Sequence, residues 1–357
     1  MSPDKKDVLA DLDWRQTANS IHEAWEAYDT VRRIVDVRDF SAQVSTNHVY
    51  KVTLSNREVI FAKLSHYGRY QDFVEDHTII NTVSNNLPYR YENFLSRALM
   101  KGKEIYTYLH EAQGRLTWVI FYRPVRVKKK LPRRLTMEQI QKMGKEFARL
   151  HKTCFEIRNT LDHNSKSMTS DIGELFVYLH TTQGQEEFGD SFHLVNRHAE
   201  LFIEHVSREP VKELPRIPIF LDWNIGNFSL TPSLRLFSRW DYDWFRIAPR
   251  ILDFYFFSRI VSDVGDKTYF HYLIDPLLED RFILFLKAYH SVYPLLPIEV
   301  QLFKEAYRFF ILNYVIKDGK YFFKDTFATR LRREAIEVYL PNIDRYNPAR
   351  ILRALNL

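Results

Sequence analysis

The chain has 357 residues with a formal net charge of +6; 45% of the residues are hydrophobic, 15% are aromatic and only 10 are glycine. This composition excludes an intrinsically disordered chain and gives enough length for two lobes with their own cores. No apolar run reaches the roughly 18 residues of a membrane span, the charged start MSPDKKDVLADLDW lacks a signal-peptide core, and the single cysteine excludes an internal disulfide, so we expect a cytoplasmic protein without membrane partners.

The first third of the chain predicts helices mixed with strands. Hydrophobic periodicity predicts a helix over residues 8–33, and a second helix is expected over 70–85. Between and after them, runs of strand-forming residues are separated by Ser55-Asn56 and by Gln113-Gly114, which are typical of hairpin turns. The predicted strands cover residues 34–40, 49–54, 58–64, 105–110 and 116–122.

A connector rich in proline, lysine and arginine follows over residues 123–135. Its densest part, RVKKKLPRR at 126–134, has no interleaved aromatic residues for base stacking, so we interpret it as a solvated connector or an anion-docking patch and consider nucleic acid an unlikely partner. Thr136 and Gln139 then form a capping-box pattern. The helix that starts there carries an apolar stripe that includes Cys154, which we interpret as core filling, and the remainder to residue 357 is mostly helical.

The most informative stretch runs from residue 217 to 254 and carries Asp222, Asn227, Asp241 and Asp253. An apolar run leads into Asp222, and Thr231-Pro232-Ser233 predicts a turn between two short strands, the second of which leads to Asp241. This arrangement suits phosphoryl transfer. A carboxylate on a loop can take a proton from an attacking hydroxyl, while a carboxamide and a second carboxylate hold magnesium on nucleotide phosphates.

The pattern resembles the aminoglycoside phosphotransferase and choline kinase family, in which the catalytic loop reads H-G-D-x-x-x-x-N, a metal aspartate follows on a hairpin, and another aspartate opens a helix about twelve residues later. One departure is that Phe220-Leu221 stands where His-Gly is usual. The resemblance covers residues 34 to 260. It implies that Asp222 is the catalytic acid–base residue, that Asn227 and Asp241 ligate Mg²⁺, and that ATP is the phosphoryl donor.

The same resemblance extends to the N-terminal part. Ser45-Thr46-Asn47 would cover the ATP phosphates, although this turn has no glycine. Lys63 in VIFAKL would neutralise phosphate charge, unless it is an edge-strand lysine that points to water. Its carboxylate partner would be Glu75 or Asp76; spacing does not choose, and the family's use of glutamate favours Glu75. Backbone groups from residue 121 to 125, including Tyr122 and Val125, would meet adenine at a hinge.

Four further expectations concern the second half. His151, at the end of a helix, is expected to support a neighbouring loop, and Asp253 is expected to bond the catalytic loop. Asp243 is interpreted as a helix N-cap in preference to a second metal-side group. Arg239 and Arg246 are expected to be solvent-exposed, with attraction of an acidic substrate as the alternative. Most of the aromatic residues after Asp253 are expected to be core, although a cage for a quaternary amine is conceivable.

Together these features predict an α+β, bilobal, protein-kinase-like fold: an N-lobe over residues 1–122 with about five antiparallel strands, a hinge and connector over 123–135, and a helical C-lobe over 136–357. The predicted activity is ATP- and Mg²⁺-dependent phosphorylation of a hydroxyl on a small molecule such as an amino alcohol, a sugar or an aminoglycoside. The alternatives are a catalytically weak, nucleotide-binding scaffold and a basic nucleic-acid-binding module. A protein kinase is disfavoured because no activation segment fits between Asp241 and Asp253.

Overall fold

The structure is a computed structural model that describes residues 14–42, 47–112, 115–162, 164–263 and 270–357. The chain divides into two compact units. The first unit comprises residues 1–81 and 96–124, and the second comprises residues 82–95 and 125–357.

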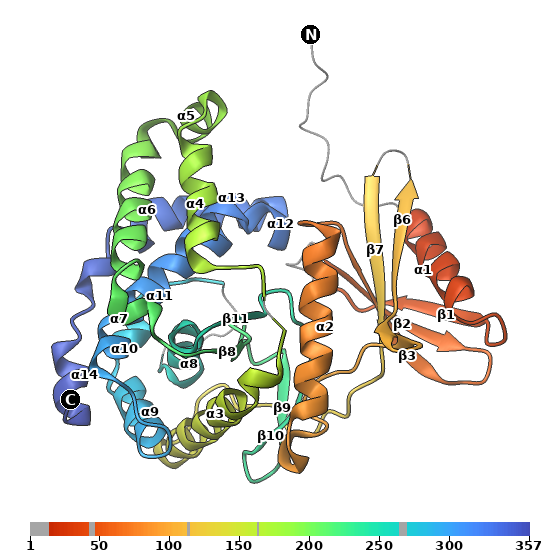
Figure 1. The fold of residues 1–357 in the computed structure, drawn as a ribbon, viewed down its shortest axis with the longest axis horizontal. Coiled ribbons are helices and arrows are strands. Elements are labelled where there is room, and N and C mark those ends of the chain that lie inside the picture. Colours follow the sequence, from red (N-terminus) through yellow and green to blue (C-terminus); the bar gives the residue numbers. More distant parts are fainter. Residues whose placement is uncertain (1–13, 43–46, 113–114, 163, 264–269) are drawn as a thin grey trace. The chain divides into compact units, whose positions relative to one another are not determined.

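The first unit is built on a five-stranded antiparallel sheet in the order β1-β2-β3-β7-β6 (Figure 1). Tyr50, Val52 and Leu54 alternate along β2 and point into a core that α1 closes with Ile21 and Trp25. Successive side chains of a strand point to opposite faces of the sheet, so these alternate apolar residues all face the core. The bounds are α1 Trp14–Tyr28, β1 Ile34–Asp39, β2 His48–Leu54, β3 Val59–Ser65, β6 Thr107–Ala112 and β7 Arg115–Tyr122, with the short pair β4 Met100–Lys101 and β5 Glu104–Ile105.

The predicted strands of this unit are confirmed to within two residues, whereas the β4–β5 pair was not predicted. The predicted helix over 8–33 is wrong at its C-terminal end, because α1 stops at Tyr28. The carboxylate of Asp29 accepts bonds from the backbone amides of Val31 (2.8 Å) and Arg32 (3.0 Å), and this local turn competes with helix continuation. The start of that prediction, the Gln113-Gly114 turn and the Ser45-Thr46 pair lie outside the described residues.

The second unit is mostly helical, and α3 (Met137–Ile157) is its longest helix. Thr136 caps it as predicted: its hydroxyl accepts from the Gln139 amide at 3.2 Å, and the Gln139 side chain accepts from the Thr136 amide at 2.9 Å. The predicted stripe is buried, including Cys154. The other helices are α2 Tyr70–Asn86, which begins in the first unit, α4 Met168–Leu179, α5 Thr182–Phe188, α6 Phe192–Val206, α7 Glu209–Lys212, α8 Phe254–Val261, α9 Asp280–His290, α10 Pro297–Gln301, α11 Phe303–Phe310, α12 Gly319–Phe322, α13 Asp325–Glu334 and α14 Ala349–Leu355.

Two small antiparallel pairs interrupt these helices. The predicted hairpin is present as β9 (Phe228–Leu230) and β10 (Leu236–Arg239). The hydroxyl oxygens of Ser229 in β9 and Ser238 in β10 are hydrogen-bonded at 2.6 Å. The second pair, β8 (Arg216–Ile219) with β11 (Arg246–Pro249), was not predicted. The connector adds to the first pair, because the backbone of Lys129 exchanges two hydrogen bonds with Leu230. It is therefore tied down by its backbone while its basic side chains are exposed.

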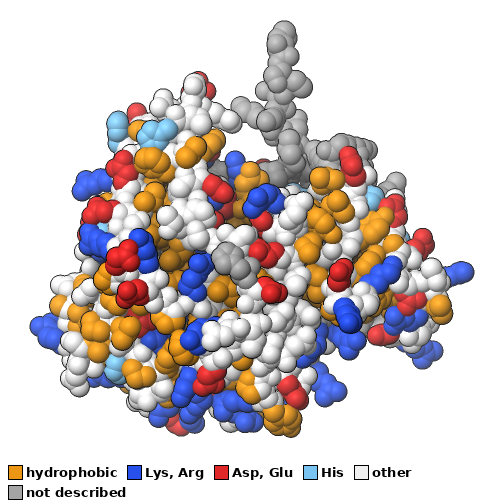
Figure 2. All heavy atoms as spheres, viewed as in Figure 1, with side chains coloured by type: hydrophobic (Ala, Val, Ile, Leu, Met, Phe, Trp, Pro, Cys, Tyr) orange, Lys and Arg blue, Asp and Glu red, His pale blue; other side chains and the backbone are white. Residues whose placement is uncertain are grey.

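Lysine and arginine side chains alternate with aspartate and glutamate on the face that Figure 2 shows, so this face carries no extended field of one sign. Among the described residues, no helix combines the length and the apolar character that a bilayer crossing requires.

The contact of α3 with α9 gives a test of the packing. A Cβ atom added to Gly144 would lie 2.5 Å from the carbonyl oxygen of Phe285 and 3.0 Å from the Cβ of Ala288. We expect Gly144→Ala to lower the free energy of unfolding by about 1–3 kcal/mol, because backbone must move to make room. Chemical denaturation measures this change.

Gly173 provides the matched control, because it lies in α4 and has no heavy atom within 4 Å of an added Cβ. Gly173→Ala should raise the stability by roughly 0.5–1 kcal/mol, as alanine does in an unhindered helix. Equal effects of the two substitutions would contradict the α3–α9 contact.

Candidate active site

The residues from 220 to 223 form a tight turn after β8 in the second unit. The amide of Asp222 donates to the carbonyl of Phe220 at 2.6 Å, and the amide of Trp223 donates to the carbonyl of Leu221 at 2.8 Å. Leu221 has φ = +52°, a conformation that side chains with a Cβ seldom adopt and that glycine adopts freely. The positive φ explains why glycine is usual at this position of the resembled pattern. Here the turn forms with a leucine at that position.

The turn is held by a buried carboxylate, as predicted for Asp253. One Asp253 oxygen accepts from the amides of Leu221 (2.7 Å) and Phe220 (3.3 Å), and the other lies 3.0 Å from Nε2 of His151. The Nδ1 atom of His151 lies 2.8 Å from the hydroxyl of Tyr289 in α9. Asp253 and His151 are 0% and 1% exposed, so His151 supports the loop through Asp253, which confirms its predicted structural role.

Aromatic packing fixes the side of the turn that faces the core. Phe220 and Trp223 are 2% and 0% exposed, and their ring centroids lie 5.6 Å apart. Trp223 also packs edge-on against Phe147 of α3 at 4.7 Å. Other rings that contact this pair are those of Phe94, Phe228, Tyr242, Phe245 and Phe257.

The two polar residues predicted for the loop are in direct contact. The Nδ2 atom of Asn227 donates to Oδ2 of Asp222 at 2.8 Å, and the amide of Asn224 donates to Oδ1 at 3.2 Å. The carbonyl of Asn227 accepts from the amide of Trp240 at 3.0 Å, which joins the loop to the end of the hairpin. The loop and the hairpin therefore present Asp222, Asn227 and Asp241 as one rigid group, in which Asp241 has φ = +69°.

Arg239 was not predicted to take part, yet it lies at the centre of this group. It is 0% exposed, and its Nη2 atom donates to the carbonyls of Asp222 (2.9 Å) and Asp241 (3.5 Å). Its guanidinium carbon lies 4.7 Å and 4.4 Å from the ring centroids of Phe220 and Trp223, a cation–π arrangement. The run LRLFSRW contains two arginines, Arg235 and Arg239, and nothing in the sequence marks Arg239 as the buried one.

Burial and charge perturb Asp222. Desolvation raises the pKa of Asp222 from its ordinary 3.8 to about 6; the negative charge of Asp241 adds to the rise, and the positive charge of Arg239 opposes it. Two carboxylates that repel each other in a partly buried site are an arrangement that a cation stabilises. A carboxyl group with a pKa near 6 is also a stronger base than an ordinary aspartate.

The donor set for a metal is small. Among the described residues, no group of three or more histidine, cysteine, aspartate or glutamate side chains is placed to hold a metal ion. Asn227 and Asp241 supply one amide and one carboxylate, both of which are oxygen ligands that Mg²⁺ accepts. Such a site suits an ion that takes its remaining ligands from phosphates and water.

In the first unit, Lys63 lies on β3, the middle strand of the sheet, and is 6% exposed. The alternative of an edge-strand lysine that points to water is therefore wrong. Of its two possible partners on α2, Asp76 is 5% exposed and Glu75 is half-buried. Asn47 is also buried, and its Oδ1 accepts from Ser65 at 3.4 Å.

The predicted hinge residues fall at the boundary between the units. Tyr122 is the last residue of β7 in the first unit, where it pairs with Phe61, and Val125 is the first residue of the long second segment of the second unit.

Two expectations for the second unit are wrong. Asp243 caps no helix: it lies in a turn before β11, and its amide approaches Oδ1 of Asp241 at 3.5 Å. Arg239 and Arg246 are not exposed; Arg246 is 4% exposed and pairs with Asp171 of α4 at 2.6 Å. The errors at Asp243 and Arg246 arise because the sequence does not reveal the β8–β11 pair, whereas Arg239 belongs to β10 and is buried against Phe220 and Trp223. Most aromatic residues after Asp253 are buried, as expected.

No protein-family model and no curated protein matches the chain by sequence. Comparison of the folds, in contrast, finds similar solved structures. The chain is similar to an amicoumacin kinase in complex with AMP-PNP and Ca²⁺ (11% identity, 92% of this chain and 97% of that one, TM-score 0.60). It is also similar to a microcompartment-associated aminopropanol kinase (15%, 94% and 99%, 0.59) and to the gentamicin–APH(2″)-IIa complex (13%, 93% and 98%, 0.55).

These likenesses establish the fold. The chain has the α+β kinase-like fold of small-molecule phosphotransferases, with a five-stranded antiparallel sheet in one unit and a helical second unit, as the sequence predicted.

The perturbed aspartate gives a prediction that needs no knowledge of a substrate. Because the pKa of Asp222 is higher in the folded state than its ordinary value, its ionisation opposes folding, and this cost is complete only above about pH 6. We expect Asp222→Asn to raise the free energy of unfolding at pH 7.5 and to raise it less at pH 5. Urea unfolding at the two pH values measures the difference.

Asp253→Asn is the matched control, since it makes the same chemical change at a carboxylate that accepts two amide bonds and contacts His151. It should lower the stability at both pH values. Destabilisation by Asp222→Asn at pH 7.5 would contradict the proposed electrostatic strain.

Proposed function

We propose that this protein is an ATP- and Mg²⁺-dependent phosphotransferase that moves the γ-phosphoryl group to a hydroxyl of a small molecule. The observation that carries the proposal is the group formed by Asp222, Asn227 and Asp241, in which a half-buried aspartate with a raised pKa touches an asparagine and neighbours a second carboxylate. The fold shared with amicoumacin and aminopropanol kinases supports it.

In this proposal Asp222 orients the acceptor hydroxyl and takes its proton. The hydroxyl oxygen forms the new bond to the γ-phosphorus as the bond from that phosphorus to the bridging oxygen breaks, so that ADP leaves with the electron pair. Mg²⁺, held by Asn227 and Asp241, would neutralise charge on the phosphates when bound. Arg239 does not reach a substrate, because it is 0% exposed; it fixes the carbonyls of Asp222 and Asp241.

We assign the nucleotide to Lys63, Asn47 and Tyr122 of the first unit, and we retain Ser45, Thr46 and Val125 as contacts expected from the sequence alone. A buried ammonium requires a nearby negative charge. The partner that burial favours is Asp76, and not Glu75 as the family pattern suggests, because Asp76 shares the buried face of α2 with Ile80 and Val83. The acceptor class is an amino alcohol, a sugar or an aminoglycoside-like compound.

The alternative function is that of a catalytically weak kinase-like protein that binds nucleotide. Its motivating observation is the replacement of His-Gly by Phe220-Leu221. The contacts of the turn argue for the enzyme, because Asp253 and Arg239 hold its amides and carbonyls in place without the usual residues.

The first test is an ATP-consumption screen of the full chain against amino alcohols, sugars and aminoglycosides, with and without Mg²⁺. We expect turnover that needs Mg²⁺ and that falls at least about 100-fold in Asp222→Asn, because a positioned general base contributes 10²–10⁴-fold. Asp190→Asn, which removes an exposed carboxylate two residues after α5, is the control and should retain most of the activity. Equal rates in wild type and Asp222→Asn, or ATP binding without any turnover, would favour the weak nucleotide-binding alternative.

A second test separates the two acids on α2. Asp76→Asn should lower kcat/KM by about tenfold or more, since a hydrogen bond to a charged group is worth about 1.5–3 kcal/mol. Glu75→Gln should stay within about twofold of wild type, because it changes the less buried of the two acids. Thermal unfolding of both variants controls for misfolding. The reverse pattern of activities would return the role to Glu75.

A further inference from the structure

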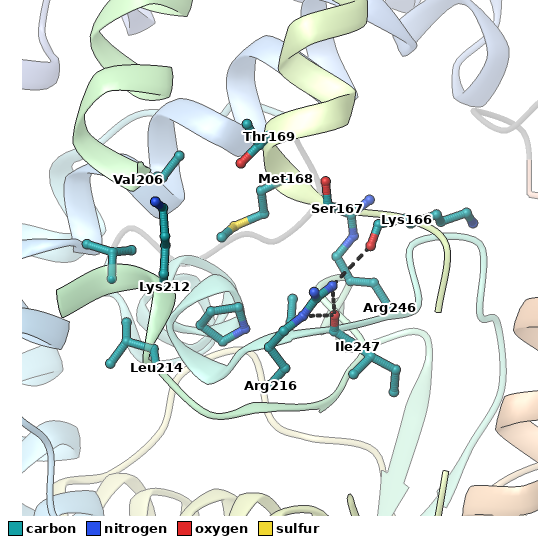
Figure 3. Close-up of a pocket in the computed structure, with 13 residues that line it drawn as sticks. Lys166, Ser167, Met168, Thr169, Val206, Lys212, Leu214, Arg216, Arg246 and Ile247 are labelled. Carbon is teal, nitrogen blue, oxygen red and sulfur yellow. Dashed lines mark hydrogen bonds between the residues drawn. The ribbon is translucent and has the colours of Figure 1, made fainter. Parts of the chain in front are cut away.

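A cavity lies in the second unit. It has a volume of about 240 Å³ and is bounded by the start of α4, the end of α6, α7, the first residue of β8 and the whole of β11 (Figure 3). Its lining residues are Lys166, Ser167, Met168, Thr169, Val206, Val211, Lys212, Leu214, Arg216, Arg246, Ile247, Ala248 and Pro249.

The charges around this cavity are of one sign. Four of the lining residues are basic and none is acidic. The side chain of Lys166 extends away from the space in Figure 3, so the cations that border it are Lys212, Arg216 and Arg246. Counter-charges lie outside the lining: Arg246 pairs with Asp171 at 2.6 Å and Lys212 with the exposed Glu209 at 3.0 Å.

Arg216 has no such counter-charge among the described residues. Its Nη2 atom donates to the carbonyls of Lys166 and Ile247 at 3.1 Å each, and its Nε atom donates to Ile247 at 3.3 Å. Desolvation and the positive charge of Arg246 lower the pKa of Arg216. Two guanidinium groups are thus held near each other by backbone and by packing, and an anion between them would relieve their repulsion.

The remaining lining suits a tetrahedral anion with a small organic part. The Thr169 side chain offers a hydroxyl donor, whereas the Ser167 hydroxyl already donates to Ser170 at 2.8 Å, and the first amides of α4, a twelve-residue helix, begin here. Arginine binds phosphate oxygens through a planar fork of donors. The lining also includes the apolar residues Val206, Val211 and Leu214, and Figure 3 shows Lys212 on the same side as Val206 and Leu214.

We propose that this cavity binds a phosphate group, carried by a small phosphate monoester or present as free phosphate. The site is separate from the phosphoryl-transfer chemistry proposed above and does not depend on it. It is nevertheless connected to the turn over residues 220–223 through the chain, because β8 runs from Arg216 at the cavity to Ile219, next to Phe220. Strand β11 runs in the opposite direction: Arg246 pairs with Ile219, and Pro249, which pairs with Arg216, leads to the segment that ends at Asp253.

Calorimetric titration of the full chain with inorganic phosphate and, separately, with phenyl phosphate tests the proposal. We expect saturable binding that is about tenfold weaker or worse in Arg216→Gln/Lys212→Gln, since a lost charge-assisted bond exceeds the free energy of one tenfold step in Kd. Tighter binding of phenyl phosphate would assign the apolar lining residues to a monoester; equal or weaker binding would assign the site to free phosphate.

The matched control is Lys142→Gln/Arg333→Gln, which removes the same net charge from exposed helix positions paired with Glu138 and Glu337. It should bind both probes as wild type does. If Arg216→Gln does not fold, the single variant Lys212→Glu at an exposed position of α7 carries the test and should also weaken binding. No saturable binding, or equal affinities in the cavity and control variants, would overturn the proposal; the second result would place the phosphate elsewhere.

Discussion

The turn over residues 220–223 of the second unit is held from two sides by buried charges. Asp253 accepts the amides of Phe220 and Leu221, and Arg239 donates to the carbonyls of Asp222 and Asp241. Because both charged side chains are 0% exposed, neither can exchange these bonds for water, and loss of either would strand a buried charge. The turn can therefore keep a leucine at positive φ, whose strain of order 1–3 kcal/mol is outweighed by fixed contacts.

This arrangement also accounts for the departure from His-Gly. Phe220 stands at the position of the usual histidine and is apolar. It packs with Trp223 in an aromatic cluster, and both rings make cation–π contacts with Arg239. The positive charge near the carbonyls of Asp222 and Asp241 thus comes from Arg239, the last residue of β10, and not from the loop itself. The loop brings Asp222 and Asn227, which are five residues apart in the sequence, into direct contact.

Local patterns in the sequence were sufficient for much of the fold. The capping box at Thr136, the 3.6-residue stripe of α3 and the turn at Thr231-Pro232-Ser233 all depend on nearby residues, and each is confirmed. The β8–β11 pair could not be predicted in this way, because RIPI and RIAP are four-residue strands that each contain proline. Arg246 was misplaced for the same reason: its partner Asp171 lies 75 residues earlier in the chain.

The electrostatics of Asp222 connect the fold with the proposed chemistry. A proton acceptor with a pKa of about 6 is ionised at neutral pH and is still more basic than an exposed aspartate. Burial alone would protonate it further, and Asp241 acts in the same direction, whereas Arg239 opposes both. Arg239 ends β10 and Asp241 follows two residues later, so the end of one short hairpin delivers both the charge that raises the pKa of Asp222 and the charge that limits the rise. A cation bound by Asp241 would shift this balance further toward the ionised base, which couples metal binding to readiness for proton transfer.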